Sequence, residues 1–174
     1  MKKRTHKPSS RSGARSEPRS QDLQELAESR VHLICQEVSR VPRFKRIFGR
    51  GVPQAFVRIV NAQTMIQLNH HYRGKDYATD VLSFTAPEPF QRLGQLGELV
   101  ICLPTLRKQA KEQGHPVGHE LEVLLVHGVL HLLGLDHELG PKEAALMARW
   151  EEKILRGLSR STQRRGLIRR SSSV

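Results

Sequence analysis

The chain is organised around one short stretch, residues 127–137, which reads His127-Gly128-Val129-Leu130-His131-Leu132-Leu133-Gly134-Leu135-Asp136-His137. A spacing of four puts His127 and His131 on one face of a helix, one turn apart. Gly134 can end that helix in a left-handed conformation, which turns the chain back and brings His137 beside the other two rings. Three neutral imidazoles in this arrangement supply three corners of a tetrahedral zinc site and leave the fourth for water. The stretch therefore predicts a catalytic centre with one Zn²⁺ per chain.

The same histidine spacing occurs in a class of zinc peptidases with the pattern His-Glu-x-x-His-x-x-Gly-x-x-His. In those enzymes the glutamate after the first histidine is the general base, and here that position is Gly128. Glycine can neither accept a proton nor orient a water molecule. The sequence thus predicts the ligand set without the peptidase base, and a peptidase would need another one, with Glu98 or Glu122 as candidates.

Two structural interpretations compete with a catalytic metal. The helix expected over residues 121–133 is apolar nearly all round, so it should be buried, and a lone histidine there would be a satisfied core residue. Three adjacent buried imidazoles, however, would need a partner for every ring nitrogen. A purely structural zinc usually has a fourth protein ligand, and neither Cys35 nor Cys102 lies close to the histidines in sequence.

The net charge of +12 is concentrated at the two ends of the 174-residue chain. Residues 1–20 contribute +6, residues 156–174 contribute another +6, and residues 21–155 sum to zero. Both ends are rich in arginine and serine and poor in large apolar residues. They are therefore predicted to be disordered basic arms around a single domain spanning residues 21–155. Such arms commonly bind nucleic acid, and the alternative is a solubilising role.

Composition also bears on the compartment. The sequence has no signal-peptide core and no run of about twenty apolar residues, so we expect no membrane association. The two cysteines are far apart and lack a paired spacing, which is typical of a reducing compartment. The sequence therefore predicts a cytoplasmic protein.

Within the neutral domain the basic residues are unevenly placed. Residues 38–75 contain eight lysines and arginines and no acid, whereas ten of the seventeen acids lie between residues 88 and 152. A basic surface near the metal site would attract a polyanion. The candidate residues for binding nucleic acid are Arg40, Arg43, Lys45, Arg46 and Lys75.

Apolar periodicity, glycines and prolines give a coarse secondary structure. Helices are expected at residues 21–40, 62–73, 104–114, 121–133 and 141–157, strands at 55–60, 80–84 and 99–103, and loops around Pro42 and at 49–53 and 88–95. The strand at 99–103 is a nearly continuous apolar run, which is typical of a central strand. Interleaved strands and helices predict an α/β fold with a small mixed β-sheet packed with several helices.

A second group of motifs points to a family. The residues Asn69-x-x-Tyr72-Arg73, followed by Thr79-Asp80-Val81-Leu82-Ser83-Phe84, resemble a signature of the YbeY family, and residues 127–137 resemble its histidine motif. Residues 97–101 are similar to its Gly-Asp-Ile strand, and Glu143, Met147 and Glu152 fall where its last helix has such residues. The resemblance covers roughly residues 55–155, with the motifs in the same order.

The resemblance implies a single-strand-specific, zinc-dependent endoribonuclease. It further implies action in ribosomal RNA processing, namely 3′-end maturation of small-subunit 16S RNA, and in ribosome quality control. The implied partners are single-stranded ribosomal RNA and the small ribosomal subunit with its assembly factors. His127, His131 and His137 would be the zinc ligands, and Arg73 the residue required beside the metal. Leu135 departs from the family's usual tyrosine, and Val123 lies where many relatives have a further histidine.

The chemistry of phosphodiester cleavage agrees with the absence of a glutamate base. Negative charge develops on phosphoryl oxygens, so a metal ion and the planar guanidinium of Arg73 are suitable partners. The nucleophile is either an activated water or the 2′-hydroxyl of the RNA. Asp136 either fixes the tautomer of a histidine ligand or satisfies the backbone of its own turn. A zinc peptidase with an unconventional base and a non-catalytic ribosome-associated RNA-binding factor remain as alternatives.

Overall fold

The computed structural model describes residues 17–49 and 51–171, with side chains described as far as Arg160. Eight helical segments and three strands alternate along this part of the chain. The predicted disorder of residues 1–16 and of residues 172–174 lies outside the described residues. Residues 17–19 precede the first helix without regular structure.

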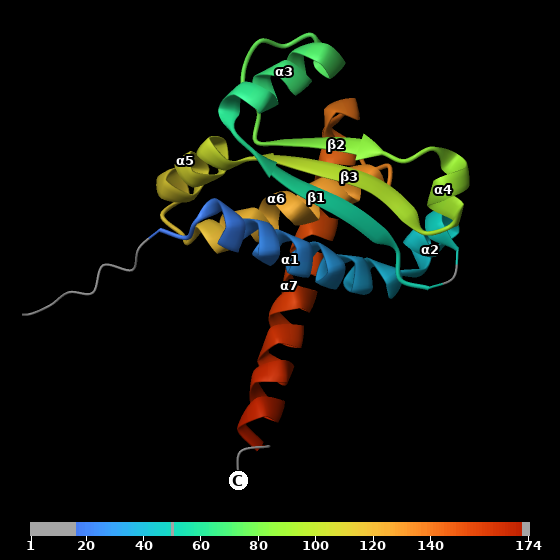
Figure 1. Ribbon diagram of the computed structural model, residues 1–174. Helices are drawn as coiled ribbons and strands as arrows, with labels where there is room; N and C mark the ends of the chain where they lie inside the picture. Colours follow the sequence, from blue (N-terminus) through green and yellow to red (C-terminus); the bar gives the residue numbers. More distant parts are fainter. Residues whose placement is uncertain (1–16, 50, 172–174) are drawn as a thin grey trace, which may run out of the picture.

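A small mixed sheet forms the centre of the molecule (Figure 1). Its strands are β1 (Gln54–Val60), β2 (Val81–Thr85) and β3 (Gln95–Cys102), in the order β1-β3-β2. Strand β3 pairs in parallel with β1 and antiparallel with β2. The predicted α/β class, the mixed sheet and the central position of the third strand are confirmed.

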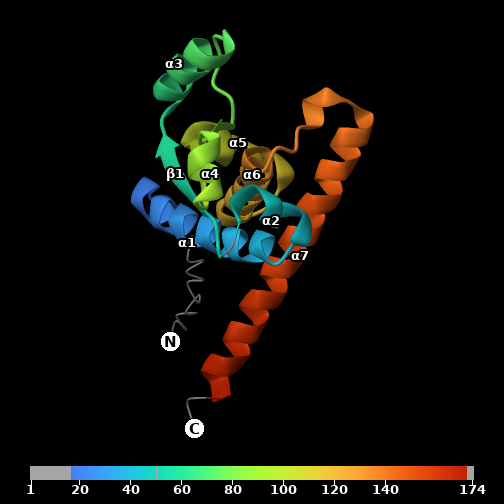
Figure 2. The same cartoon turned by 90° about the vertical axis from the view of Figure 1, so that its right-hand side faces the viewer.

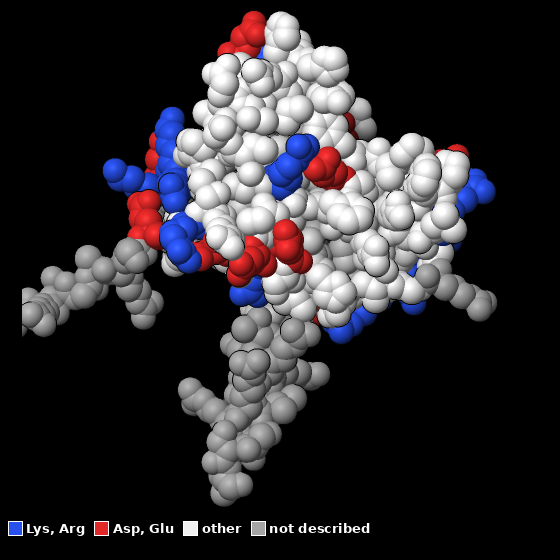
Figure 3. Space-filling view, in the orientation of Figure 1, with Lys and Arg blue, Asp and Glu red and all other residues white. Residues whose placement is uncertain are grey.

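Helices cover the two faces of the sheet unequally (Figure 2). Helices α1 (Ser20–Ser39) and α6 (Val117–Leu132) pack on the inner face, and α7 (Pro141–Ser171) packs against them from behind. Helix α3 (Ala62–Arg73) covers only one end of the outer face, next to α5 (Leu103–Gln113). The view in Figure 3 shows the sheet side of the molecule as mostly uncharged.

The main core lies between the inner face of the sheet and helices α1, α6 and α7. Leu99 and Ile101 of β3 pack there with Leu125 and Val129 of α6, and all four are fully buried. A second, smaller core on the outer face is formed by Met65, Leu82, Val100 and Cys102 under α3. Alternation along β3 thus sends successive side chains into different cores.

Two short helices replace predicted loops. Helix α2 (Pro42–Phe48) begins with the proline that the sequence analysis placed in a loop, and α4 (Glu88–Arg92) lies within the loop predicted for residues 88–95. Proline is well suited to a first helical position, because its missing N–H would have no intrahelical partner there. Phe44 and Phe48 of α2 are buried one turn apart. A helix of two turns offers too few residues for its periodicity to be recognised in the sequence.

The last helix is longer than the sequence predicts. We expected it to end near Gly157, with a disordered tail from residue 156, but α7 continues to Ser171. Gly157 lies where α7 passes close to α1, and a Cβ there would be 2.8 Å from Oε2 of Glu37. Ile154 and Leu158 are both buried. The glycine therefore permits helix packing rather than ending the helix, and residues 156–160 belong to the folded body.

The replacement Leu158→Ala tests this extended boundary. Leu158 is 1% exposed, so removing its side chain should lower the free energy of unfolding by about 2–4 kcal/mol through lost burial and a cavity. Denaturant unfolding measures the change. Leu93→Ala is the control because Leu93 is 79% exposed and its truncation should change stability by less than about 0.5 kcal/mol. Equal stabilities for the two variants would contradict the packing of residues 156–160 on the body.

Candidate metal centre

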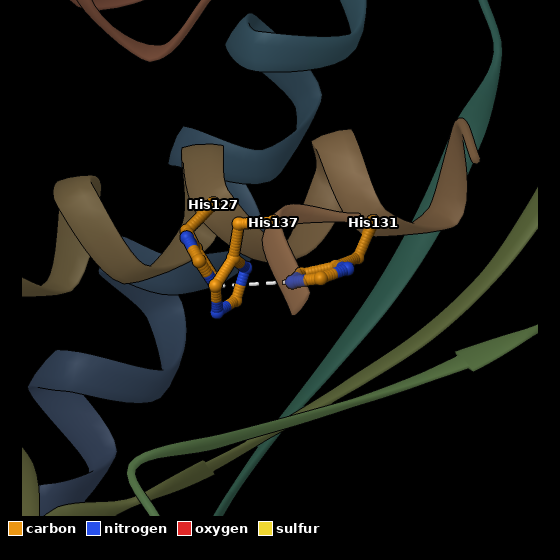
Figure 4. A group of neighbouring side chains, drawn as sticks. All are labelled: His127, His131 and His137. Carbon is orange, nitrogen blue, oxygen red and sulfur yellow. Dashed lines mark hydrogen bonds between the residues drawn. The ribbon is translucent and has the colours of Figure 1, made fainter. Parts of the chain in front are cut away.

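The three histidines converge at the end of α6 (Figure 4). His127 and His131 project from its last turns, and His137 is the first residue of the short 3-10 helix η1 (His137–Leu139). Gly134 has a φ of 80° and its amide donates to the His131 carbonyl at 2.9 Å, which turns the chain back after α6. The ring centroids are 4.7, 5.1 and 5.1 Å apart. The structure thus brings together the three side chains that the spacing predicts.

The donor atoms fit a single divalent ion. One nitrogen from each ring lies within 4.8 Å of the others, and Nε2 of His127 is 3.2 Å from Nε2 of His131. Two nitrogens on a tetrahedral zinc ion, each about 2.0–2.1 Å from the metal, are themselves roughly 3.3 Å apart. Among the described residues, no other His, Cys, Asp or Glu joins this group. The arrangement offers three ligands and an open side.

The electrostatics of the cluster favour neutral imidazoles, which are the form that binds metals. Burial lowers the pKa of His131 below its usual value, and the adjacent His127 and His137 lower it further when charged. Neither cysteine competes as a ligand. Cys35 is buried in α1, where desolvation raises its thiol pKa to about 12, and Cys102 lies in the smaller core.

A carboxylate on α7 orients one of the rings. Oε1 of Glu151 accepts a hydrogen bond from Nδ1 of His127 at 2.7 Å, which leaves Nε2 of His127 facing the other histidines. This hydrogen bond lowers the pKa of Glu151 despite its partial burial. Carboxylate–histidine pairs of this kind fix the tautomer and increase the basicity of a metal-binding ring.

The sequence analysis missed Glu151 and considered Asp136 for this role. Oδ1 of Asp136 instead accepts from the backbone amide of Glu138 at 2.9 Å and caps η1, which is the turn role left open above. The available signal for Glu151 was its place on α7, one turn after the buried Met147, one turn before the buried Ile154 and two turns before the buried Leu158. A carboxylate within an otherwise apolar stripe calls for a partner.

The histidines open into a pocket of about 650 Å³. Its other walls are β2, the end of α3, which contributes Arg73, and the segment that joins α3 to β2, which contributes Lys75 and Tyr77. Arg73 Nη2 is 2.9 Å from Oε1 of Glu138, directly after His137, and this interaction lowers the pKa of the Glu138 carboxyl. A guanidinium far from the histidines in sequence therefore lies across the pocket from them.

Comparison with known proteins agrees with this geometry. The model of one protein family, described as "Endoribonuclease YbeY", matches residues 16–159. The chain belongs to the YbeY family. The resemblance seen in the sequence motifs is confirmed, and the match extends further toward both ends than the motifs do.

Two of the most similar curated YbeY proteins come from bacteria. The chain is 49% identical over 114 residues to the protein of Alkalilimnicola ehrlichii, covering 63% of this chain and 68% of that protein. It is 50% identical over 107 residues to the protein of Xanthomonas axonopodis pv. citri, covering 59% of this chain and 66% of that protein. The solution structure of TM1509 from Thermotoga maritima covers 84% of this chain and 89% of its own, with a TM-score of 0.52 and 28% identity.

In this YbeY family member, the position of the missing peptidase base has no room for a side chain. A Cβ on Gly128 would lie 2.7 Å from Cδ2 of Leu99, because α6 packs closely on β3 there. The alternative bases are elsewhere: Glu98 pairs with Arg58 at 3.1 Å and Glu122 with Arg30 at 3.8 Å. Neither glutamate lines the pocket.

The predicted RNA-binding residues are only partly gathered at the pocket. Lys75 lines it, with Nζ 5.9 Å from the centroid of the Tyr77 ring. Arg40 pairs with Glu37 at the end of α1, and the exposed residues Arg43, Lys45 and Arg46 lie on α2; none of these four lines the pocket. The structure therefore does not assemble the five residues into one basic surface around the histidines.

Asp80 has a structural role at the start of β2. Burial acts to raise its pKa, but hydrogen bonds from Gln109 at 2.9 Å, the Val81 amide at 2.8 Å and Thr79 at 3.1 Å outweigh burial and lower it. These bonds fix the start of β2 at the pocket wall.

Within residues 17–49 and 51–171, no helix has the length and apolar character needed to cross a membrane.

The replacement Glu151→Gln tests the carboxylate beside His127. It should weaken Zn²⁺ affinity about 10- to 100-fold, because the ring loses its charged acceptor and part of its basicity. Titration against a zinc-binding dye measures the dissociation constant. Glu152→Gln is the matched control, since Glu152 is exposed and pairs with Arg156 one turn further along α7. Equal affinities for both variants would exclude the role assigned to Glu151.

Proposed function

We propose that the chain is a single-strand-specific, zinc-dependent endoribonuclease that acts in ribosomal RNA processing. The processing step is the 3′-end maturation of small-subunit 16S RNA, with a further role in ribosome quality control. Its partners are single-stranded ribosomal RNA and the small ribosomal subunit with its assembly factors, and it acts in the cytoplasm. Support comes from membership of a family described as endoribonucleases and from the pocket that combines three histidines with Arg73.

The proposal rests mainly on one observation: three histidines form a metal site with one open side, and the guanidinium of Arg73 lies in the same pocket. Imidazole ligands suit Zn²⁺, and three of them with one free side are typical of catalytic rather than structural zinc sites. His127, His131 and His137 would hold the ion, and Glu151 would keep His127 oriented. When bound, the ion supplies Lewis-acid chemistry to a phosphodiester group.

Arg73 is positioned to bind the phosphate that is cleaved. Its guanidinium lines the pocket and presents several N–H donors, which can grip two phosphoryl oxygens at once. Because charge on these oxygens grows in the transition state, a fixed donor stabilises that state more than the ground state. Lys75, on the same wall, adds positive charge for the neighbouring backbone.

Arg73 forms an ion pair with Glu138 in the structure, so the phosphate of a bound RNA has to replace the Glu138 carboxylate. The pair is partly exposed, with side-chain exposures of 37% for Arg73 and 58% for Glu138. Exchange of such a pair costs little, because exposed ion pairs contribute at most about 1 kcal/mol. Glu138 therefore competes with RNA for the arginine, but too weakly to prevent RNA from binding.

Arg73→Ala tests the proposed reaction. It should reduce cleavage of single-stranded ribosomal RNA about 100- to 1,000-fold, the usual effect of removing one donor to a developing oxyanion. Metal content, measured by elemental analysis, should stay at one ion per chain. Arg92→Ala on α4 is the control, because that arginine is exposed and pairs with Glu88 away from the pocket. Undiminished cleavage by Arg73→Ala would contradict the role of Arg73. If the wild-type protein cleaves casein but leaves the RNA intact, the peptidase alternative is favoured.

Glu138→Gln tests the competition for Arg73. The variant frees the guanidinium from its carboxylate partner, so RNA affinity should rise by up to about fivefold, as the modest energy of an exposed pair allows. Fluorescence anisotropy with labelled single-stranded RNA measures the dissociation constant. A weaker complex would show instead that Glu138 holds Arg73 in its binding position.

A further inference from the structure

The described helices cover the outer face of the sheet only in part. Helix α3 covers the end formed by Leu82, Val100 and Cys102. The short helix α4 contacts β3 at the opposite end of the sheet, and no described helix lies over the part between them (Figures 1 and 2). At the open end, Glu98 of β3 is in register with Phe56 of β1 and Phe84 of β2. Paired residues of adjacent strands project to the same face, so these three side chains form one row across the sheet.

The row is continued by aromatic rings from the end of α3. Tyr72 meets Phe84 edge to face, with ring centroids 4.7 Å apart, and His71 meets Tyr72 at 4.6 Å. Phe56 is 61% exposed and Tyr72 is 60% exposed. Single exposed apolar side chains are common, but exposed rings gathered on one face mark a binding surface.

The aromatic row leads into the metal pocket. Tyr72 and Phe84 both line that pocket, together with Tyr77 and the three histidines. A strand of RNA whose phosphate lies at Arg73 can therefore extend over β2 and β3 onto the outer face. Phe56 lies two strands from Phe84, roughly 10 Å away at the usual spacing of strands, which is within reach of the nucleotides next to the cleaved bond.

The charges on this face suit bases better than phosphates. Arg58 and Glu98 project there and pair with each other at 3.1 Å, so they largely cancel. Figure 3 shows the rest of the face as mostly uncharged around one adjacent blue and red pair, with a group of acidic residues below it over α1. The positive charge that a phosphate can reach lies instead in the pocket, at Lys75 and at Arg73, whose exposed pair with Glu138 can exchange.

We propose that Phe56, Phe84 and Tyr72 form a stacking platform for the bases of single-stranded RNA beside the cleaved phosphate. This proposal rests on the nuclease function proposed above. Aromatic side chains on an open sheet bind single strands because every base has a π-face, largely without sequence preference. Bases inside a duplex are stacked on each other and cannot reach Phe56. The platform would therefore give the site its preference for single strands.

Variants of Phe56 test the platform, because this side chain lies outside the pocket and is exposed. We would measure the dissociation constant of the metal-loaded protein for a single-stranded RNA carrying 2-aminopurine, whose fluorescence falls when it stacks. Phe56→Ala should weaken binding about 5- to 150-fold, the usual effect of losing one base–aromatic stack, and should relieve the quenching. Phe56→Tyr keeps the ring and should bind like the wild type. Leu93→Ala, which removes an exposed apolar side chain from the end of α4, should change neither signal.

Two outcomes would overturn the platform. Unchanged affinity and quenching in Phe56→Ala would show that RNA does not reach this face. Wild-type binding by Phe56→Leu would show an ordinary apolar contact rather than stacking, because leucine keeps the apolar surface without the ring. The binding assay is independent of cleavage. If the wild type binds and quenches the probe but cleaves no RNA, the proposed nuclease function fails while the platform stands.

Discussion

The close packing of α6 on the central strand β3 is the constraint on which the site depends. At Gly128 the helix approaches Leu99 so closely that a Cβ would lie 2.7 Å from a leucine methyl carbon. The neighbouring residues His127 and His131 are then held beside β2, the edge strand that forms the pocket wall. The glycine that removes the peptidase base is thus also the residue that lets the metal helix reach the sheet. Gly128 therefore affects both the packing of α6 on the sheet and the chemistry of the site.

Three other elements complete the site, each through one main interaction. The turn at Gly134 returns His137 to the end of α6, α7 supplies Glu151 for His127, and α3 presents Arg73 across the pocket. Since α7 is anchored by the buried Leu158, the length of that helix contributes to the position of the carboxylate. A change in α7 packing should therefore affect the metal site through Glu151, although α7 provides no direct ligand.

The sequence predicted the features that depend on local spacing. The histidine pattern, the alternation of strands and helices and the apolar run of β3 are all encoded within short windows, and the structure agrees with each. Arg73 was found only through the family motif, because nothing in the local sequence distinguishes it from a solvated charge at a helix end. The RNA-binding candidates on α2 were chosen from charge alone, and charge gives no information on which face of the fold a residue occupies.

What the sequence did not reveal depends on tertiary contacts. Glu151 lies 24 residues from its partner His127, so only the folding of α7 against α6 identifies it. Gly157 looked like a helix end, yet it marks the crossing of α7 and α1. The exposed ring of Phe56 became meaningful only when the register of the sheet aligned it with Phe84. In each case the decisive partner is distant in the chain.

X-ray absorption spectroscopy of the zinc-loaded protein tests the central claim most directly. The account predicts three imidazole nitrogens at about 2.0–2.1 Å and a fourth position filled by solvent, with the imidazole signal reduced in His131→Ala. A fourth protein ligand, a sulfur atom among the ligands, or a wild-type spectrum in His131→Ala would contradict an open three-histidine centre.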